Sequence, residues 1–181
     1  MKILVTGGVK NGKTDYAQEL TLRLANGGKR YYVATMLPWD EEDRLRIRLH
    51  RENRAGMGFE TLEQGRNILS CLDTASKNGA FLLDSTTALL MNELFSDTVT
   101  FRPNIDAAEQ CVKDLVTFAQ CAENIVIVSD GMYTDAAIYD EATELYRKYL
   151  AKIDRALATV CDTVIEVTAG IPIAHKGELP L

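Results

Sequence analysis

A glycine-rich loop close to the amino terminus constrains the fold of this chain more than any other feature. Its residues, Gly7 to Thr14, read GGVKNGKT and fit the pattern G-x-x-x-x-G-K-[ST]. The loop follows the short apolar run KILVT and precedes a helical pattern. Glycines let the backbone N–H groups of such a loop wrap around a phosphate, and the N-terminus of the next helix adds partial positive charge. The motif therefore predicts a phosphate-binding loop between a strand and a helix.

The loop residues suggest how a nucleoside triphosphate would be held. Lys13 is expected to reach the β- and γ-phosphates, and the Thr14 hydroxyl is expected to hold Mg²⁺. A carboxylate at the end of another buried strand usually completes such a magnesium site; Asp84 is the first candidate and Asp130 the second. The alternative is an ordinary glycine-rich turn, with both aspartates capping the elements that follow. The predicted phosphate contacts are Gly7, Gly8, Val9, Lys10, Asn11, Gly12, Lys13 and Thr14.

Strand-like and helix-like segments alternate along the rest of the chain. Near-continuous apolar runs are typical of parallel strands that are covered on both faces. Such runs lie at 2–6, 30–36, 80–85, 124–130 and 163–169, and helical patterns occupy 14–26, 41–54, 105–122 and 135–160. This order predicts one α/β domain over 1–181, a P-loop NTPase (RecA-like) with a mainly parallel sheet flanked by helices. The end of the chain, 174–181, is expected to be weakly ordered.

The composition argues against two classes of protein, general nucleic-acid binders and membrane-spanning proteins. The net charge is -6, which disfavours nucleic acid but still allows a local basic patch for a small anion. No apolar run approaches the ~20 residues of a membrane span, and the first residues do not read as a signal peptide, so a cytoplasmic protein is expected. The four cysteines are widely spaced and are expected to be reduced and mostly buried.

A second motif, RLRIRLHRENR, places a histidine between arginines. Arg46 and Arg54 lie four residues before and after His50, so on a helix capped by Asp40 they would share its face. Two guanidiniums would lower the pKa of the imidazole and would also bind phosphate oxygens, and a neutral imidazole is a nucleophile. The alternative is an exposed histidine without a role on a charged helix. The segment taken alone favours that alternative.

The two motifs together resemble one enzyme family, the bifunctional adenosylcobinamide kinase / adenosylcobinamide-phosphate guanylyltransferases of cobalamin biosynthesis. The opening ILVTGGVKNGKT is similar to the phosphate loop of that family. The blocks YYVATM, LLDSTTALLMNEL and IVIVSD also resemble it, and the resemblance covers nearly the whole chain. Single positions that match are Asp40, Glu41, Glu42, Arg46, Ile47, His50, Arg54, Thr61, Glu63, Asp84, Thr87, Asn92, Arg147, Ala158 and Asp162.

The resemblance implies a two-step reaction with Mg²⁺, in a homotrimer. GTP or ATP would phosphorylate the hydroxyl of the aminopropanol arm of adenosylcobinamide, and His50 would then carry GMP from GTP to that phosphate. The implied catalytic residues are His50 and Lys13, with Thr14 and Asp84 on the metal. Besides 7–14, the implied nucleotide contacts are Ala34, Thr35, Met36, Arg46, Arg51, Glu52, Asn53, Arg54, Glu63 and Asp84.

The chain departs from the family pattern mainly in one region. After IVIVS the family has Asn-Glu-Val-Gly, then a glycine and a proline, where this chain has Asp130-Gly131-Met132-Tyr133, then Asp135 and Ile138. Further on, a glycine and an Asn–Gln pair are replaced by Ala151 and Asp154-Arg155. We hypothesise that this region faces the corrinoid or orders the acceptor of the kinase step. The alternative is neutral drift in a surface loop.

Two other functions are compatible with the same motifs. One is a phosphate-loop kinase that acts on a different small alcohol, with His50 inert. The other is a regulatory or assembly protein that binds GTP without chemistry. The presence of Lys13, Thr14, Asp84 and His50 argues against the second function, because a binding protein needs no nucleophile.

Overall fold

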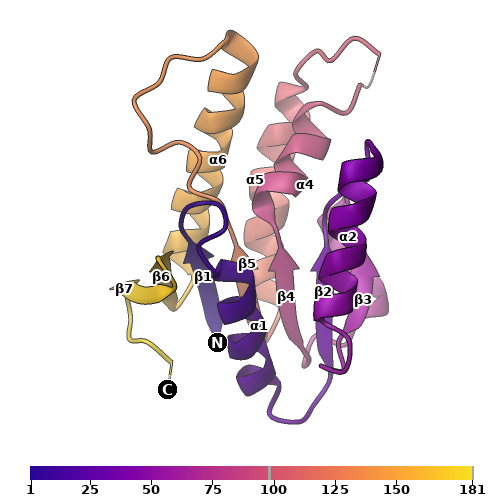
Figure 1. Ribbon diagram of the computed structural model, residues 1–181, viewed down its shortest axis with the longest axis vertical. Helices are drawn as coiled ribbons and strands as arrows, with labels where there is room; N and C mark the ends of the chain where they lie inside the picture. Colours follow the sequence, from indigo (N-terminus) through magenta and orange to yellow (C-terminus); the bar gives the residue numbers. More distant parts are fainter. Residues whose placement is uncertain (98, 181) are drawn as a thin grey trace.

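A seven-stranded sheet forms the centre of the molecule, seen here in a computed structural model that describes residues 1–97 and 99–180 (Figure 1). The strand order is β3-β2-β4-β5-β1-β6-β7. Neighbouring strands run parallel, except that β7 is antiparallel to β6. The strands are β1 (Lys2–Thr6), β2 (Arg30–Ala34), β3 (Glu60–Glu63), β4 (Ala80–Asp84), β5 (Asn124–Val128), β6 (Thr163–Thr168) and β7 (Ile171–Lys176).

Helices cover both faces of the sheet, with α1 in front and α5 and α6 behind in Figure 1. Strand side chains alternate between faces, so Ile3 and Val5 of β1 pack with α1 while Leu4 packs with the opposite cluster. Among the described residues, no helix is both long and apolar enough to cross a membrane. The helices are α1 (Lys13–Ala25), α2 (Glu41–Asn53), α3 (Cys71–Thr74), α4 (Thr86–Leu94), α5 (Ile105–Cys121) and α6 (Glu141–Val160), with a short 3-10 helix, η1 (Ile68–Ser70), before α3.

The expected α/β fold is confirmed, and the five strands and four helices read from the sequence are all present. Two expectations about segments were wrong. Part of the chain end forms β7, which pairs with β6. The last long helix begins at Glu141 instead of residue 135, because the Asp140 side chain accepts the Thr143 N–H at 3.0 Å and caps it there. The strand β3 was missed because ETLE is a polar edge strand with no apolar signal.

Parallel pairing puts the carboxyl ends of β1, β5, β4 and β2 side by side at one edge of the sheet (Figure 1). The loops that leave these ends are tied together by backbone hydrogen bonds. The Gly131 N–H donates to the Gly7 carbonyl at 3.2 Å, and the Thr35 N–H donates to the Asp84 carbonyl at 3.3 Å. Residues from distant parts of the sequence therefore meet at this edge, which is where parallel α/β sheets bind their ligands.

Three of the four cysteines are buried in the core, as the sequence predicts, and all four are free thiols. Burial raises the pKa of Cys71 to about 11 and that of Cys111 and Cys161 to about 12. Cys121, at the end of α5, is exposed. Since the thiolate is the reactive form and must be reached by a reagent, Cys121 is the one accessible thiol among the four described cysteines.

We predict that a thiol reagent at pH 8 modifies one cysteine of the native protein quickly and all four after denaturation. Mass spectrometry of the timed reaction measures this directly. Cys121→Ser should remove the fast phase and leave the slow ones. Rapid native modification of Cys71, Cys111 or Cys161 would contradict the core described above.

Candidate functional site

The phosphate loop between β1 and α1 depends on glycine for its shape. Gly7 has a φ of 142°, and a Cβ atom there would lie 2.3 Å from the Val167 carbonyl oxygen of β6. Gly12, at the start of α1, has a φ of 84°. A side chain at Gly7 would collide with backbone that cannot move aside, so the loop can pack against β6 only with glycine there.

Lys13 is buried at the floor of this loop, with 5 % of its surface exposed. Its Nζ donates to the Gly8 carbonyl at 2.7 Å and lies 2.7 Å from Asp130 Oδ1. The ammonium is thus held between the phosphate loop and the residue that follows β5. Asp130 therefore contacts the phosphate loop through Lys13. The aspartate that contacts Thr14, the predicted magnesium ligand, is Asp84.

Thr14 and Asp84 lie together, as the magnesium hypothesis requires. Thr14 Oγ1, at the start of α1, donates to Asp84 Oδ2, at the end of β4, at 3.3 Å. A hydroxyl and a carboxylate are hard oxygen donors, and Mg²⁺ in nucleotide sites commonly takes only one or two protein ligands beside phosphate oxygens and water. The residues present fit this ion.

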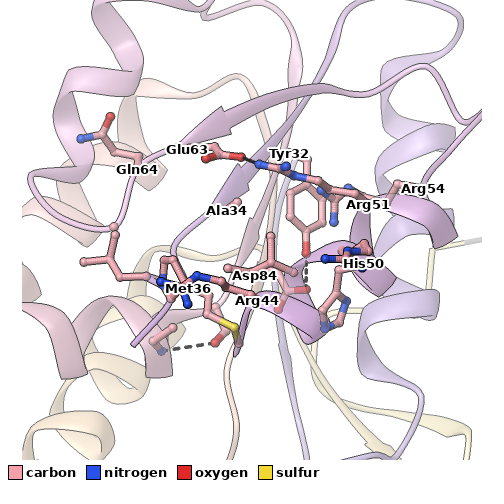
Figure 2. Close-up of a pocket in the computed structure, with 17 residues that line it drawn as sticks. Tyr32, Ala34, Met36, Arg44, His50, Arg51, Arg54, Glu63, Gln64 and Asp84 are labelled. Atoms are coloured by element: carbon pink, nitrogen blue, oxygen red, sulfur yellow. Dashed lines mark hydrogen bonds and ion pairs between the residues drawn. The ribbon is translucent and has the colours of Figure 1, made fainter. Parts of the chain in front are cut away.

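A cavity of about 410 Å³ opens beside Asp84, between α2 and the ends of β2, β3 and β4 (Figure 2). Its α2 wall is strongly basic, and Figure 2 shows His50, Arg51 and Arg54 on that side, across from Tyr32, Ala34 and Asp84. The cavity is lined by Tyr32, Ala34, Met36, Leu37, Pro38, Arg44, Ile47, Arg48, His50, Arg51, Arg54, Glu63, Gln64, Gly65, Asp84, Ser85 and Ala88.

The structure brings several of the sequence-predicted nucleotide contacts together and leaves others outside the cavity. Residues 7–14 form the neighbouring loop, and Asp84 borders both sites. Thr35 is buried and bonds to the Ser85 backbone, while Arg46 pairs with Glu42 on the helix surface. The predicted residues that line the cavity are Ala34, Met36, His50, Arg51, Arg54, Glu63 and Asp84; those that do not are Thr35, Arg46, Glu52 and Asn53.

Spacing on α2 explains which arginines reach the cavity. Arg44, Arg48 and Arg51 lie at intervals of four and three residues, so they form one stripe with His50 and Arg54 at its margin. Arg46 points further around the helix. The sequence reading missed Arg44 and Arg48 because it placed the face by symmetry about His50. Which arginines face the strands depends on how the helix is oriented in the fold, and the segment alone does not specify that orientation.

Tyr32 connects the cavity with the phosphate loop and was not predicted as a site residue. Its hydroxyl donates to Asp84 Oδ2 at 2.6 Å. Burial, and then the Asp84 carboxylate, raise the pKa of this hydroxyl far above its usual value, so it stays a neutral donor. Arg54 lies over the ring, with Cζ 3.4 Å from the ring centroid.

Arg54 itself is 7 % exposed, and its Nη1 has no hydrogen-bond partner among the described residues. A buried guanidinium with a free donor is costly unless an acceptor is supplied. Arg54 lines the cavity, and the oxygens of a phosphate are the acceptors that guanidinium groups bind best. The stack on Tyr32 holds the donor ready for such a ligand.

A sequence model of one family, described as cobinamide kinase / cobinamide phosphate guanyltransferase, matches residues 3–175 of the chain. The chain belongs to this family. It is 27% identical to the bifunctional adenosylcobalamin biosynthesis protein CobU of Salmonella typhimurium, over 97% of this chain and 100% of that protein. It is also 27% identical to the bifunctional adenosylcobalamin biosynthesis protein CobP of Pseudomonas aeruginosa, over 98% of this chain and 99% of that protein. The resemblance identified from the motifs is confirmed.

Solved structures agree with the fold at much lower sequence similarity. A protein from Pyrococcus horikoshii OT3, solved as project PH0250, superposes with a TM-score of 0.51 at 13% identity, covering 98% of this chain and 87% of that one. At this identity the likeness concerns the fold alone. It agrees with a mainly parallel sheet flanked by helices, in which β5 lies between β1 and β4.

We predict that Tyr32→Phe weakens Mg²⁺-dependent nucleotide binding about tenfold, because Asp84 loses the donor that orients it. It should also lower the free energy of unfolding by about 1 kcal/mol. Titration of a fluorescent nucleotide with and without Mg²⁺, and urea unfolding, measure the two effects.

Tyr31→Phe is the matched control. The Tyr31 hydroxyl accepts the Ser76 N–H at 3.1 Å on the opposite face of the sheet, so its loss should cost comparable stability and leave nucleotide binding unchanged. Equal binding by the Tyr32→Phe variant and the wild type would show that Asp84 is oriented without Tyr32.

Proposed function

We propose that this chain is a bifunctional transferase that phosphorylates adenosylcobinamide and then converts the product to adenosylcobinamide-GDP with GMP from GTP. The observation that carries the proposal is the junction at Asp84. That residue belongs both to the Thr14 pair of the phosphate loop and to the cavity lined by His50. Membership of the cobinamide kinase / cobinamide phosphate guanyltransferase family agrees with both halves of the reaction.

In the kinase half, residues 7–14 would surround the phosphates of ATP or GTP through backbone N–H groups. Lys13 would exchange Asp130 and the Gly8 carbonyl for phosphate oxygens. Thr14 and Asp84 would hold Mg²⁺, which neutralises charge on the phosphates when bound. Tyr32 would keep Asp84 aimed at that position. These residues position and neutralise the reacting groups, which is most of what phosphoryl transfer requires.

In the guanylyl half, His50 would act as the nucleophile. An imidazole nitrogen forms a bond to the α-phosphorus of GTP, the bond to the oxygen of the β-phosphate breaks, and pyrophosphate leaves. A phosphate oxygen of the corrinoid then attacks the same phosphorus, and the nitrogen–phosphorus bond breaks. Arg51 and Arg54 line the cavity with His50 and would bind the phosphate oxygens, as would Arg44 and Arg48. Ala34, Met36 and Glu63 would contact the nucleotide from the strand side.

The remaining features of the proposal come from the element order and composition of the sequence and, for the trimer alone, from the family resemblance. The chain would form one nucleotide-binding domain over 1–181, work in the cytoplasm without a nucleic-acid partner, and assemble as a homotrimer. Two leucines agree with a protein contact on α2. Leu45 is 50% exposed and Leu49 is 48% exposed, and they lie four residues apart on the side of the helix away from the cavity.

We predict a solution mass three times the 20.1 kDa of the chain in multi-angle light scattering. Leu49→Glu should reduce that mass if the outer face of α2 lies in the contact, because a buried unpaired carboxylate opposes association. A wild-type mass of one chain at micromolar concentration would contradict the trimer.

We predict that incubation with GTP and Mg²⁺ adds the mass of one GMP to the intact protein. The adduct should be lost in acid, as expected of a nitrogen–phosphorus bond to His50, and His50→Ala should gain nothing. His175→Ala is a matched control, since the only other histidine is exposed on β7 and pairs with Glu166. Clean GTP binding without any adduct would favour a kinase or a pure binding protein.

A further inference from the structure

Several residues at which this chain differs from its family form side-chain pairs near the phosphate loop. Asp130 pairs with Lys13 at 2.7 Å, and the Tyr133 hydroxyl donates to Asp154 Oδ2 at 2.7 Å. Asp135 pairs with Arg147 at 2.9 Å. Tyr133 and Asp154 are both departures, and the tyrosine in place of a glycine supplies the hydroxyl that donates to Asp154. The changed residues Asp130, Tyr133 and Asp135, with Asp154, are thus all engaged in side-chain contacts, and together they form one unit beside the phosphate loop.

The unit fixes the backbone on both sides of Asp130. Ser129 Oγ donates to the buried Asp154 at 3.0 Å, and the Asp130 N–H donates to Thr87 Oγ1 at 3.2 Å. The Gly131 N–H donates to the Gly7 carbonyl at 3.2 Å. Further along, the Arg147 guanidinium donates to carbonyl oxygens of Met132, Asp135 and Ala137 and so holds the loop that rises above the sheet (Figure 1).

Asp130 combines this fixed position with access from solvent. Its side chain is 25% exposed, and β5 carries it between the phosphate loop after β1 and Asp84 at the end of β4. The two neighbouring carboxylates, Asp84 and Asp154, accept hydrogen bonds from hydroxyl groups. Asp84 accepts from Thr14 and Tyr32, and Asp154 is 6% exposed, with its pKa raised by burial. Asp130 differs from these two because its partner is Lys13, which a triphosphate would bind. Asp130 would then lose that partner.

We propose that Asp130 is the catalytic carboxylate of the phosphoryl-transfer step, an inference that rests on the kinase half of the proposed function. With a triphosphate bound, Lys13 turns to the phosphates and leaves the Asp130 carboxylate beside the terminal one. There it accepts a hydrogen bond from the attacking hydroxyl of the acceptor. The hydroxyl oxygen bonds to the γ-phosphorus, the bond to the β–γ bridging oxygen breaks, the nucleoside diphosphate leaves, and the hydroxyl proton passes to Asp130.

The surroundings of Asp130 suit an acceptor that carries a bulky apolar group. Met132, Ile138 and Tyr139 are exposed on the same loop, with Ile138 96% exposed. A large ring system resting on them would bring a flexible hydroxyl arm toward the end of β5. The position of the carboxylate is also particular to this chain: the family pattern has glutamate where Gly131 stands, and Asp130 supplies the acidic group one residue earlier.

The test compares the two half-reactions in the wild type and in Asp130→Asn. Phosphorylation of cobinamide by ATP is followed by product formation, and guanylylation of His50 by intact mass. We expect kcat for phosphorylation to fall about 10²-fold or more, because the proton acceptor is lost. Nucleotide affinity should stay equal or tighten, since Lys13 no longer pairs with a carboxylate, and transfer of GMP to cobinamide phosphate should persist. Asp130→Glu, which keeps a carboxylate at a displaced position, should retain part of the phosphorylation rate.

Asp135→Asn is the matched control, because it makes the same change in the same loop and leaves an amide oxygen for Arg147. It should phosphorylate cobinamide like the wild type. Phosphorylation by Asp130→Asn at the wild-type kcat would overturn the inference and leave the proposed function standing. An equal loss in both half-reactions with weaker nucleotide binding would also overturn it, since Asp130 would then only position Lys13. A wild type that guanylylates but never phosphorylates would overturn both the inference and the kinase half.

Discussion

The parallel pairing of β1, β5, β4 and β2 is the constraint on which the rest of the structure depends. It sets the phosphate loop, Asp130, Asp84 and Tyr32 next to one another at one edge of the sheet, although they come from four separate segments. Hydrogen bonds between the loops, such as Gly131 to Gly7, fix the distances that the strands leave open. Strand order and these loop contacts together bring the polar groups of the candidate site within hydrogen-bonding distance.

The two parts of the site are coupled through one row of side chains. Thr14, Asp84, Tyr32 and Arg54 follow one another from the phosphate loop to the basic cavity, each in contact with the next. A carboxylate that shifts on binding a metal and triphosphate would move the tyrosine hydroxyl, and with it the surface on which the Arg54 guanidinium rests. Binding at the phosphate loop would in this way affect the basic cavity, so both half-reactions could use one phosphate loop.

The sequence predicted the features that local patterns encode. It missed those that depend on the rotation of a helix or on which strands are neighbours in the sheet. Continuous apolar runs predicted the buried strands, GGVKNGKT predicted the loop that carries Thr14, and the end of AFLLD predicted Asp84 as its partner. The rotation of α2, which brings Arg44 and Arg48 into the cavity in place of Arg46, is a property of the folded molecule that the helix segment alone does not specify. The Lys13–Asp130 pair follows from β5 lying next to β1, and no spacing in the sequence reports that neighbourhood.

The helix that carries His50 adds nothing to the core. All thirteen residues of α2 are at least partly exposed, and the side chain that anchors its end is Arg54, stacked on Tyr32. An element without buried side chains can change its sequence with little effect on the core. It can also tilt or partly unwind at small cost in stability, because few buried contacts are broken. Substitutions can therefore alter the basic wall of the cavity while the sheet and its phosphate loop remain as they are.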